Sequence, residues 1–199
     1  MGGGGGNALN RTLDKAIAGA GLALTSPLLL AAAIATKLES GGPVLYRQTR
    51  VGKDGVDFEV LKLRTMVVGA ESMGAGYAVD KGDSRITRAG RVLRRTSIDE
   101  LPQLWNIVRG DMSVIGPRPT LRYQVEQYDE HQRRRLEIRP GLTGWAQVQG
   151  RASLPWAERI ELDVWYVEHR SPKVDLEILL RTPLALFRGT YRGATGGWR

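Results

Sequence analysis

Two adjacent carboxylates, Asp99 and Glu100, stand in the stretch SIDELPQLWN of a strongly basic chain. Arginine-rich segments flank them, RITRAGRVLRRT before and RGDMSVIGPRP after. An aspartate beside arginines can attack phosphorus to form an acyl phosphate, or hold a hard divalent cation. A neighbouring glutamate can accept a proton or share the metal, while guanidinium groups match the oxygens of a transferring phosphate. These residue types therefore indicate phosphoryl transfer.

A capping role explains the same stretch without chemistry. Ser97 can cap a helix while Glu100 reaches back to it, which is the pattern of a capping box. Pro102 argues against this register, because its missing N–H would fall inside the helix. With Asp99 as the N-cap, Pro102 lies in the first turn, where no partner is needed. Both registers leave two ionised carboxylates at the positive end of a helix dipole, so capping and chemistry both remain open here.

The composition limits the classes of partner. The 199-residue chain has a formal net charge of +8 and 42% hydrophobic residues, which favours a buried core and an anionic partner. The absence of cysteine from the sequence excludes disulfides and thiolate metal sites. A rival function is a non-catalytic, membrane-attached basic module that binds acidic lipid or nucleic acid. Because no RNA- or DNA-binding motif is present in the sequence, we expect no nucleic acid partner.

The segment at residues 16–35 contains no charged residue. As a helix it would be about 30 Å long, the thickness of a bilayer core. A spanning helix, a buried soluble helix and a re-entrant or shallow membrane helix are all compatible with this length. A cleaved signal peptide is a further rival, but the apolar run is too long for its usual apolar region. Ser26-Pro27 at the centre predicts a sharp bend, and the serine hydroxyl can satisfy a carbonyl that the proline leaves free. Basic residues flank both ends, so we favour a bent helix that enters and leaves by one face.

The remaining pattern predicts the elements that position the carboxylates. The turn KDG at 53–55 separates two strands, 44–52 and 56–66, and so predicts a β-hairpin. The apolar alternation shifts at Leu61, which indicates a bulge or a change of buried face. Helical periodicity covers residues 85–95, 99–108, 123–138, 156–169 and 175–189, the last interrupted at Pro183. The expected fold is α/β in the mixed α+β sense, a small helical body around one hairpin, with the re-entrant membrane helix at its N-terminus.

Four segments together resemble the bacterial sugar transferase family: LKLRTM, RTSIDELPQLWNIVRGDMSVIGPRP, RPGLTGWAQVQGR and ELDVWYVEH. They are similar to its small monotopic, PglC-like polyprenyl-phosphate phosphoglycosyl transferases, from about Arg11 to Phe187. The resemblance implies transfer of a sugar phosphate from a UDP-sugar to undecaprenyl phosphate, with release of UMP and with Mg²⁺ as cofactor. It also implies a re-entrant helix broken at Ser26-Pro27, in contact with lipid of the bacterial inner membrane, and an active site that faces the cytoplasm. The sugar, the pathway and self-association into a homo-oligomer stay undecided.

The resemblance also implies roles for individual residues. Asp99 is the implied nucleophile, which forms a phosphosugar–enzyme intermediate and contacts Mg²⁺. Glu100 is an implied assisting base or second residue of the metal site. The implied substrate-binding residues are Lys62, Arg94, Arg118, Arg151 and Asp163. Within this set Arg118, from the Pro-Arg-Pro motif, is expected at phosphate, and Arg151 at the nucleotide.

The expected organisation has four parts: a flexible glycine-rich head at 1–10, the re-entrant helix at 11–40, a cytosolic catalytic domain at 41–190 and a short tail at 191–199. Gln149, where the family usually has Asn, and Leu63, where it often has Phe, are mild departures that concern the sugar or the packing.

Two further groups have simple interpretations. The run Arg133-Arg134-Arg135 is expected to be solvated. Four of the five tryptophans form an interfacial belt or pack between helices, namely Trp145, Trp156, Trp165 and Trp198.

Overall fold

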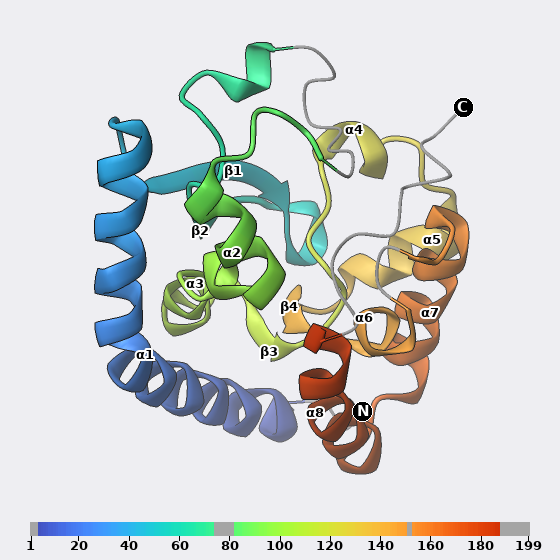
Figure 1. Cartoon of the computed structure of the whole chain (residues 1–199). Helices are drawn as coiled ribbons and strands as arrows, with labels where there is room; N and C mark the ends of the chain where they lie inside the picture. Colours follow the sequence, from blue (N-terminus) through green and yellow to red (C-terminus); the bar gives the residue numbers. More distant parts are fainter. Residues whose placement is uncertain (1–3, 74–81, 151–152, 188–199) are drawn as a thin grey trace.

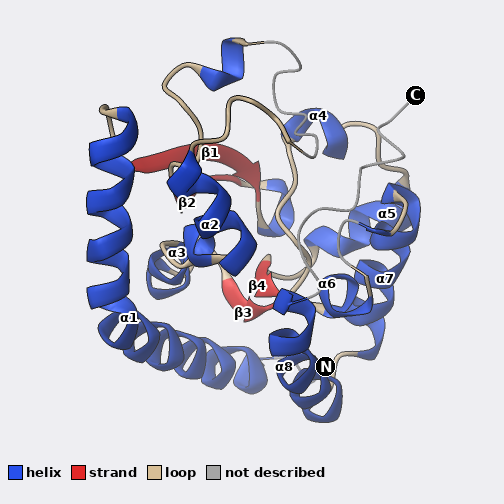
Figure 2. Cartoon of the chain, viewed as in Figure 1, coloured by secondary structure: helices blue, strands red, loops and turns tan. Residues whose placement is uncertain are grey.

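The computed structural model describes residues 4–73, 82–150 and 153–187. The fold is mixed α+β and mostly helical, with two small sheets near its centre (Figures 1 and 2). The elements in chain order are α1 (Gly4–Ser40), β1 (Leu45–Val51), η1 (Lys53–Gly55), β2 (Asp57–Leu63), η2 (Ala70–Ser72), α2 (Arg88–Thr96), η3 (Ile98–Glu100), α3 (Gln103–Arg109), β3 (Ser113–Ile115), α4 (Arg122–Val125), α5 (Glu130–Arg133), η4 (Arg134–Leu136), β4 (Gly141–Thr143), α6 (Trp145–Gln149), α7 (Trp156–His169) and α8 (Pro172–Phe187), where η denotes a 3₁₀ turn.

The predicted hairpin is confirmed. Strands β1 and β2 pair antiparallel, from Leu45 opposite Leu63 to Val51 opposite Asp57, whereas β3 and β4 form a separate parallel pair. Asp54 and Gly55 in the turn have positive φ angles of 56° and 77°, as short hairpin turns require. The β1–β2 register runs without interruption along these described strands, so the shift at Leu61 is a change of buried face.

Helix α1 bends in its middle, and Figure 1 shows its two limbs meeting at an angle. Pro27 lies within the helix and has no N–H to donate to the carbonyl of Ala23, four residues earlier. The Ser26 hydroxyl donates to that carbonyl instead, at 2.9 Å. The predicted bend and the predicted role of the serine are both confirmed.

Both limbs of α1 pack against the rest of the protein. In the first limb, buried Ala18 contacts a cluster that includes Leu104 and Ile107 of α3. In the second limb, Ala32 packs with Leu63 of β2 and Leu93 of α2. The opposite face is apolar and exposed, with Leu13, Ile17, Leu24, Leu28, Leu30, Ile34 and Leu38. The stretch Arg11–Ser40 is long and apolar enough to cross a membrane.

Several element boundaries differ from those predicted. Helix α1 already begins at Gly4, inside the segment expected to be a flexible head. The predicted helix over 123–138 is three short pieces, because Asp129 caps α5: its carboxylate accepts from the Gln132 N–H at 2.8 Å, and the Gln132 side chain bonds back to the Asp129 N–H at 3.3 Å. Helix α8 continues through Pro183 instead of breaking there.

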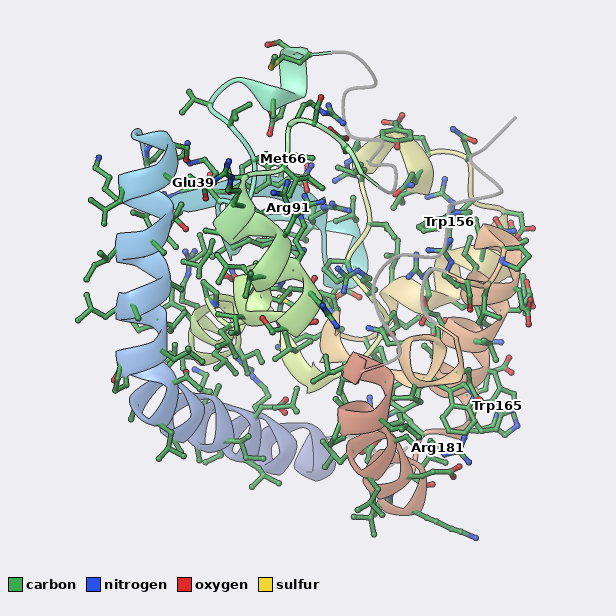
Figure 3. The ribbon with its side chains drawn as sticks, in the orientation of Figure 1. Glu39, Met66, Arg91, Trp156, Trp165 and Arg181 are labelled. Carbon is green, nitrogen blue, oxygen red and sulfur yellow. The ribbon has the colours of Figure 1, made fainter. Side chains whose placement is uncertain are left out.

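Trp145, Trp156 and Trp165 pack between elements. Trp145 and Trp165 stack with their ring centroids 4.9 Å apart, and the Arg181 guanidinium lies 5.7 Å from the Trp145 ring. Figure 3 shows Trp165 and Arg181 at the same corner of the molecule, with Trp156 well apart from them. These contacts favour packing over an interfacial belt; Trp198 lies outside the described residues.

Candidate active site

The two carboxylates lie on a tight turn between α2 and α3. Helix α2 ends at Thr96, the following Ser97 has a left-handed backbone with φ of 57°, and η3 carries Asp99 and Glu100. Among the described residues the Ser97 side chain caps no helix, and α3 has Pro102 at its N-cap position. Both predicted capping registers are therefore wrong. The carboxylates do not cap α3, so both are available for other contacts.

Glu100 is held by two cations from distant parts of the chain. Its Oε1 accepts from Lys62 Nζ of β2 at 2.8 Å and from an Arg118 guanidinium nitrogen at 2.5 Å. Burial alone would raise the pKa of Glu100, but the charges and hydrogen bonds of Arg118 and Lys62 outweigh it and hold the pKa well below its usual range. Glu100 is therefore a firmly ionised anchor for both cations.

Asp99 has the opposite environment. Its side chain is only 8% exposed, and within the described parts of the chain it accepts no hydrogen bond and forms no ion pair. Burial, together with the negative charge of Glu100, raises its pKa to about 6, against the opposing effect of Lys62, Arg94 and Arg118. A carboxylate that is desolvated and unpartnered has its oxygens available for a phosphorus atom or a cation.

Arg94 approaches the pair from α2. Its Nε donates to the Thr65 hydroxyl, just after β2, at 2.7 Å. Its charge is one of those that lower the pKa of Asp99. The structure therefore brings together Lys62, Arg94 and Arg118 with the two carboxylates, from four separate parts of the sequence.

A small hollow adjoins these residues. It is lined by Arg50, Val60, Lys62, Gln103, Arg118 and Pro119. Two of these polar residues, Arg50 and Gln103, were not predicted as site residues. The Arg50 guanidinium donates to Gln48 Oε1 at 2.5 and 3.0 Å and to the Pro119 carbonyl at 3.3 Å. Its position opposite the Pro-Arg-Pro loop follows from the bridge between the neighbouring Val51 and Thr120, which the sequence does not show directly.

The Pro-Arg-Pro loop is fixed through its backbone carbonyls. The carbonyl of Pro117 accepts from the Gly141 N–H at 2.9 Å, and that of Thr120 accepts from the Val51 N–H at 2.9 Å. The carbonyl of Arg118 accepts from the Arg135 guanidinium at 2.9 Å. With the backbone so constrained, the Arg118 side chain points to Glu100 while remaining 44% exposed, so a ligand can still reach it.

Asp163 supports this loop from behind. It is 2% exposed and forms an ion pair with buried Arg135, which in turn contacts the Tyr128 hydroxyl at 2.5 Å. The interpretation of residues 133–135 as a solvated run is therefore wrong for Arg135. Asp163 is connected to Arg118 through Arg135, which contacts both residues. Direct binding of substrate by Asp163 stays a prediction.

The remaining implied residue, Arg151, lies outside the described residues. For Mg²⁺, the donor set is the free Asp99 carboxylate, since Glu100 Oε1 is occupied by two cations. The described residues contain no cluster of three or more acidic or histidine side chains. Mg²⁺ commonly uses one or two carboxylates together with substrate phosphates and water, so Asp99 beside a bound diphosphate fits that ion.

Comparison with known proteins decides the family. The sequence profile described as bacterial sugar transferase matches residues 6–189. The chain belongs to the bacterial sugar transferase family. It is 42% identical over 174 residues to the uncharacterized sugar transferase EpsL of Bacillus subtilis, covering 87% of this chain and 85% of that protein.

Two other relatives have names that state a reaction. The UDP-glucose:undecaprenyl-phosphate glucose-1-phosphate transferase of Caulobacter vibrioides is 48% identical over 180 residues, covering 86% of this chain and 67% of its own. The UDP-N-acetylgalactosamine-undecaprenyl-phosphate N-acetylgalactosaminephosphotransferase of Aeromonas hydrophila is 43% identical over 187 residues, covering 91% of this chain and 44% of that protein. This family membership makes the chain a transferase and removes the support for a non-catalytic basic module.

Proposed function

We propose that this sugar transferase moves a sugar 1-phosphate from a UDP-sugar to undecaprenyl phosphate and releases UMP. The observation that carries the proposal is the buried Asp99 carboxylate, which has no partner among the described residues and lies beside Lys62, Arg94 and Arg118. The names of the two relatives give the substrate classes. Because one is named for glucose and the other for N-acetylgalactosamine, the sugar is left to experiment.

In the first step an Asp99 oxygen attacks the phosphorus that carries the sugar. The bond from this phosphorus to the bridging oxygen breaks, and UMP leaves with the electron pair. Lys62 and Arg118 are placed to neutralise the phosphate oxygens, as preorganised cations do in phosphoryl transfer. The product of this step is an acyl phosphate on Asp99 that still holds the sugar.

In the second step a phosphate oxygen of the polyprenol attacks the same phosphorus and releases Asp99. Glu100 serves this mechanism as the residue that orients Lys62 and Arg118. Its strongly lowered pKa makes it a poor proton acceptor, so the role of assisting base is the less favoured of its two implied roles.

Mg²⁺, held by Asp99 and the diphosphate, would neutralise charge on the phosphate oxygens and orient the leaving group. The polyprenol acceptor requires a membrane, and the exposed apolar face of α1 supports attachment there. Since both limbs of α1 pack against the same body, we place α1 as a re-entrant helix in the inner membrane, with the site facing the cytoplasm.

The test uses full-length protein in lipid nanodiscs with Mg²⁺ and a panel of UDP-sugars. We expect UMP release from at least one donor, and a burst of about one UMP per enzyme when undecaprenyl phosphate is omitted. Intact-protein mass spectrometry should then show the added sugar phosphate. Asp99→Asn should lose the burst and the adduct, whereas Asp54→Asn, the same substitution in the exposed hairpin turn, should keep both.

Two results would contradict the proposal. If UMP appears only when the acceptor is present and no adduct is detected, the reaction proceeds by direct displacement, without a covalent intermediate. No UMP from any UDP-sugar by a folded, membrane-inserted sample would exclude this donor class. Addition of EDTA is expected to abolish turnover, and undiminished turnover would remove Mg²⁺ from the mechanism.

A further inference from the structure

Gln103 has a buried side-chain amide that does not form all the hydrogen bonds it could. The residue is 3% exposed, and its Nε2 has no hydrogen-bond partner within the described residues. A buried amide donor without a partner costs free energy, so native proteins retain few of them. Its presence here calls for a partner that arrives with a ligand or with water.

The backbone places this amide on the same side as the carboxylates. Leu101 and Pro102, between η3 and α3, both have right-handed helical torsion angles, with φ of −57° and −60°. The turn and the helix therefore form one continuous right-handed path. Residues three and four apart on such a path share a face, so we expect Gln103 on the same face as Glu100 and Asp99.

The surroundings of the amide select an anionic ligand. Gln103 lines the hollow together with Arg50, Lys62 and Arg118. Glu100 forms ion pairs with Lys62 and Arg118, whereas Arg50 has no carboxylate partner among the described residues. With a volume of about 20 Å³, the hollow admits a water molecule or a single oxygen of a phosphate group.

We propose that Gln103 donates its Nε2 hydrogen bond to an oxygen of the phosphate that Asp99 attacks, the distal phosphate of the UDP-sugar. Arg50 forms the opposite wall of this oxygen site. The inference rests on the proposed function. Since UMP is the leaving group in that function, the phosphate that Asp99 attacks must be the distal one, which carries the sugar. Gln103 thus discriminates a diphosphate from a monophosphate ligand.

The experiment compares Gln103→Met with wild type by calorimetric binding of UDP and of UMP, each with Mg²⁺ and in nanodiscs. Methionine keeps the length of the side chain and removes the donor. We expect UDP to bind about tenfold more weakly, the size of one lost hydrogen bond to a charged group, while UMP binding changes less than twofold. Gln127→Met, the same change on an exposed residue of the region after α4, should leave both affinities unchanged.

Thermal unfolding of the ligand-free proteins separates a ligand role from a structural one. Because the amide lacks a partner in the free protein, Gln103→Met should unfold at the same temperature as wild type or higher. A lower unfolding temperature with equal weakening of UDP and UMP would overturn the proposal, and so would unchanged UDP affinity, which would assign the hollow to water. Gln103→Glu, of nearly the same shape, should weaken UDP binding more than Gln103→Met because it brings a negative charge to the phosphate.

Turnover distinguishes failure of this inference from failure of the proposed function. If wild type releases UMP and Gln103→Met matches its kcat/KM, only the role of Gln103 is wrong. If wild type releases no UMP from any UDP-sugar, the proposed function fails, whatever the UDP affinities are.

Discussion

At the scale of single residues, the two adjacent carboxylates have opposite electrostatic states. Glu100 is paired with Lys62 and Arg118, and its pKa is well below the usual range. Asp99 is buried beside that fixed negative charge, and its pKa is raised to about 6. One neighbour therefore orients cations while the other keeps its oxygens free. This asymmetry predicts that an ionised Asp99 lowers the stability of the ligand-free protein.

The sign of the pH dependence follows from the raised pKa. Between pH 4 and about 6 the folded protein holds a proton on Asp99 that the unfolded chain has lost, so stability falls as pH rises through this window and then levels off. Above pH 6 the cost of ionising the buried Asp99 is about 3 kcal/mol.

Asp99→Asn removes this cost. We expect its thermal midpoint at pH 7.5, without added Mg²⁺, to exceed that of wild type by about 6–12 °C. The difference should shrink at pH 5, and tryptophan fluorescence in nanodiscs can follow it. A midpoint below that of wild type at pH 7.5 would mean that the Asp99 carboxylate makes a stabilising contact.

At the scale of elements, α2 connects the end of α1 to the carboxylates. The Glu39 carboxylate at the end of α1 accepts from the Arg88 and Ala89 N–H groups at 2.6 and 2.7 Å, where anions are favoured at a helix N-terminus (Figure 3). At its other end α2 leads through Ser97 into η3. The placement of α2 therefore helps to set the placement of Asp99.

Close packing fixes α2 against the end of β2. A Cβ atom added to Gly90 would lie 2.0 Å from the carbonyl oxygen of Thr65, which is a backbone atom and cannot move aside cheaply. We expect Gly90→Ala to displace α2, to destabilise the protein by about 1–3 kcal/mol and to reduce turnover at least tenfold. Gly19→Ala, in α1 with open space around it, is the matched control.

Chemical denaturation and UMP release measure both effects. Gly19→Ala should be neutral or slightly stabilising, since alanine favours helix over glycine. Equal behaviour of the two variants would show that the contact between Gly90 and Thr65 does not constrain α2.

At the scale of the whole molecule, α1 encloses one side of the protein. Its first limb lies along α3 and its second along β2 and α2, so a straight helix would lose one of the two contacts (Figure 1). Pro27 is thus required for one helix to cover both parts.

The absence of cysteine from the sequence allows the membrane topology to be tested directly. We expect single cysteines at Arg11 and Lys37, both exposed, to react with a membrane-impermeant maleimide from the cytoplasmic side only, like a reference cysteine at Glu130. Labelling of inverted vesicles and of intact spheroplasts measures this. If Arg11→Cys reacted from the outer side while Lys37→Cys did not, α1 would span the membrane. Pro27→Ala should shift the protein toward that spanning pattern.

Much of the local structure was predictable because it depends on short-range chemistry. The hairpin follows from Asp54-Gly55, and the bend from Ser26-Pro27 together with the serine hydroxyl that compensates it. The break in the predicted helix over 123–138 also had a signal, since Asp129 and Gln132 have the spacing of a capping box. The continuity of α8 through Pro183 had none, because packing of neighbouring helices overrides local propensity.

The sequence by itself determined the residue types of the site and the family to which its motifs belong. Asp99, Glu100, Lys62, Arg94 and Arg118 were identified from motifs and brought together by the fold. Only the tertiary structure decided how the charges are divided, because pKa values depend on burial and on partners far apart in the chain. It paired Glu100 rather than Asp99, buried Arg135 behind the Pro-Arg-Pro loop, and placed the amide of Gln103 at the hollow that Lys62 and Arg118 also line.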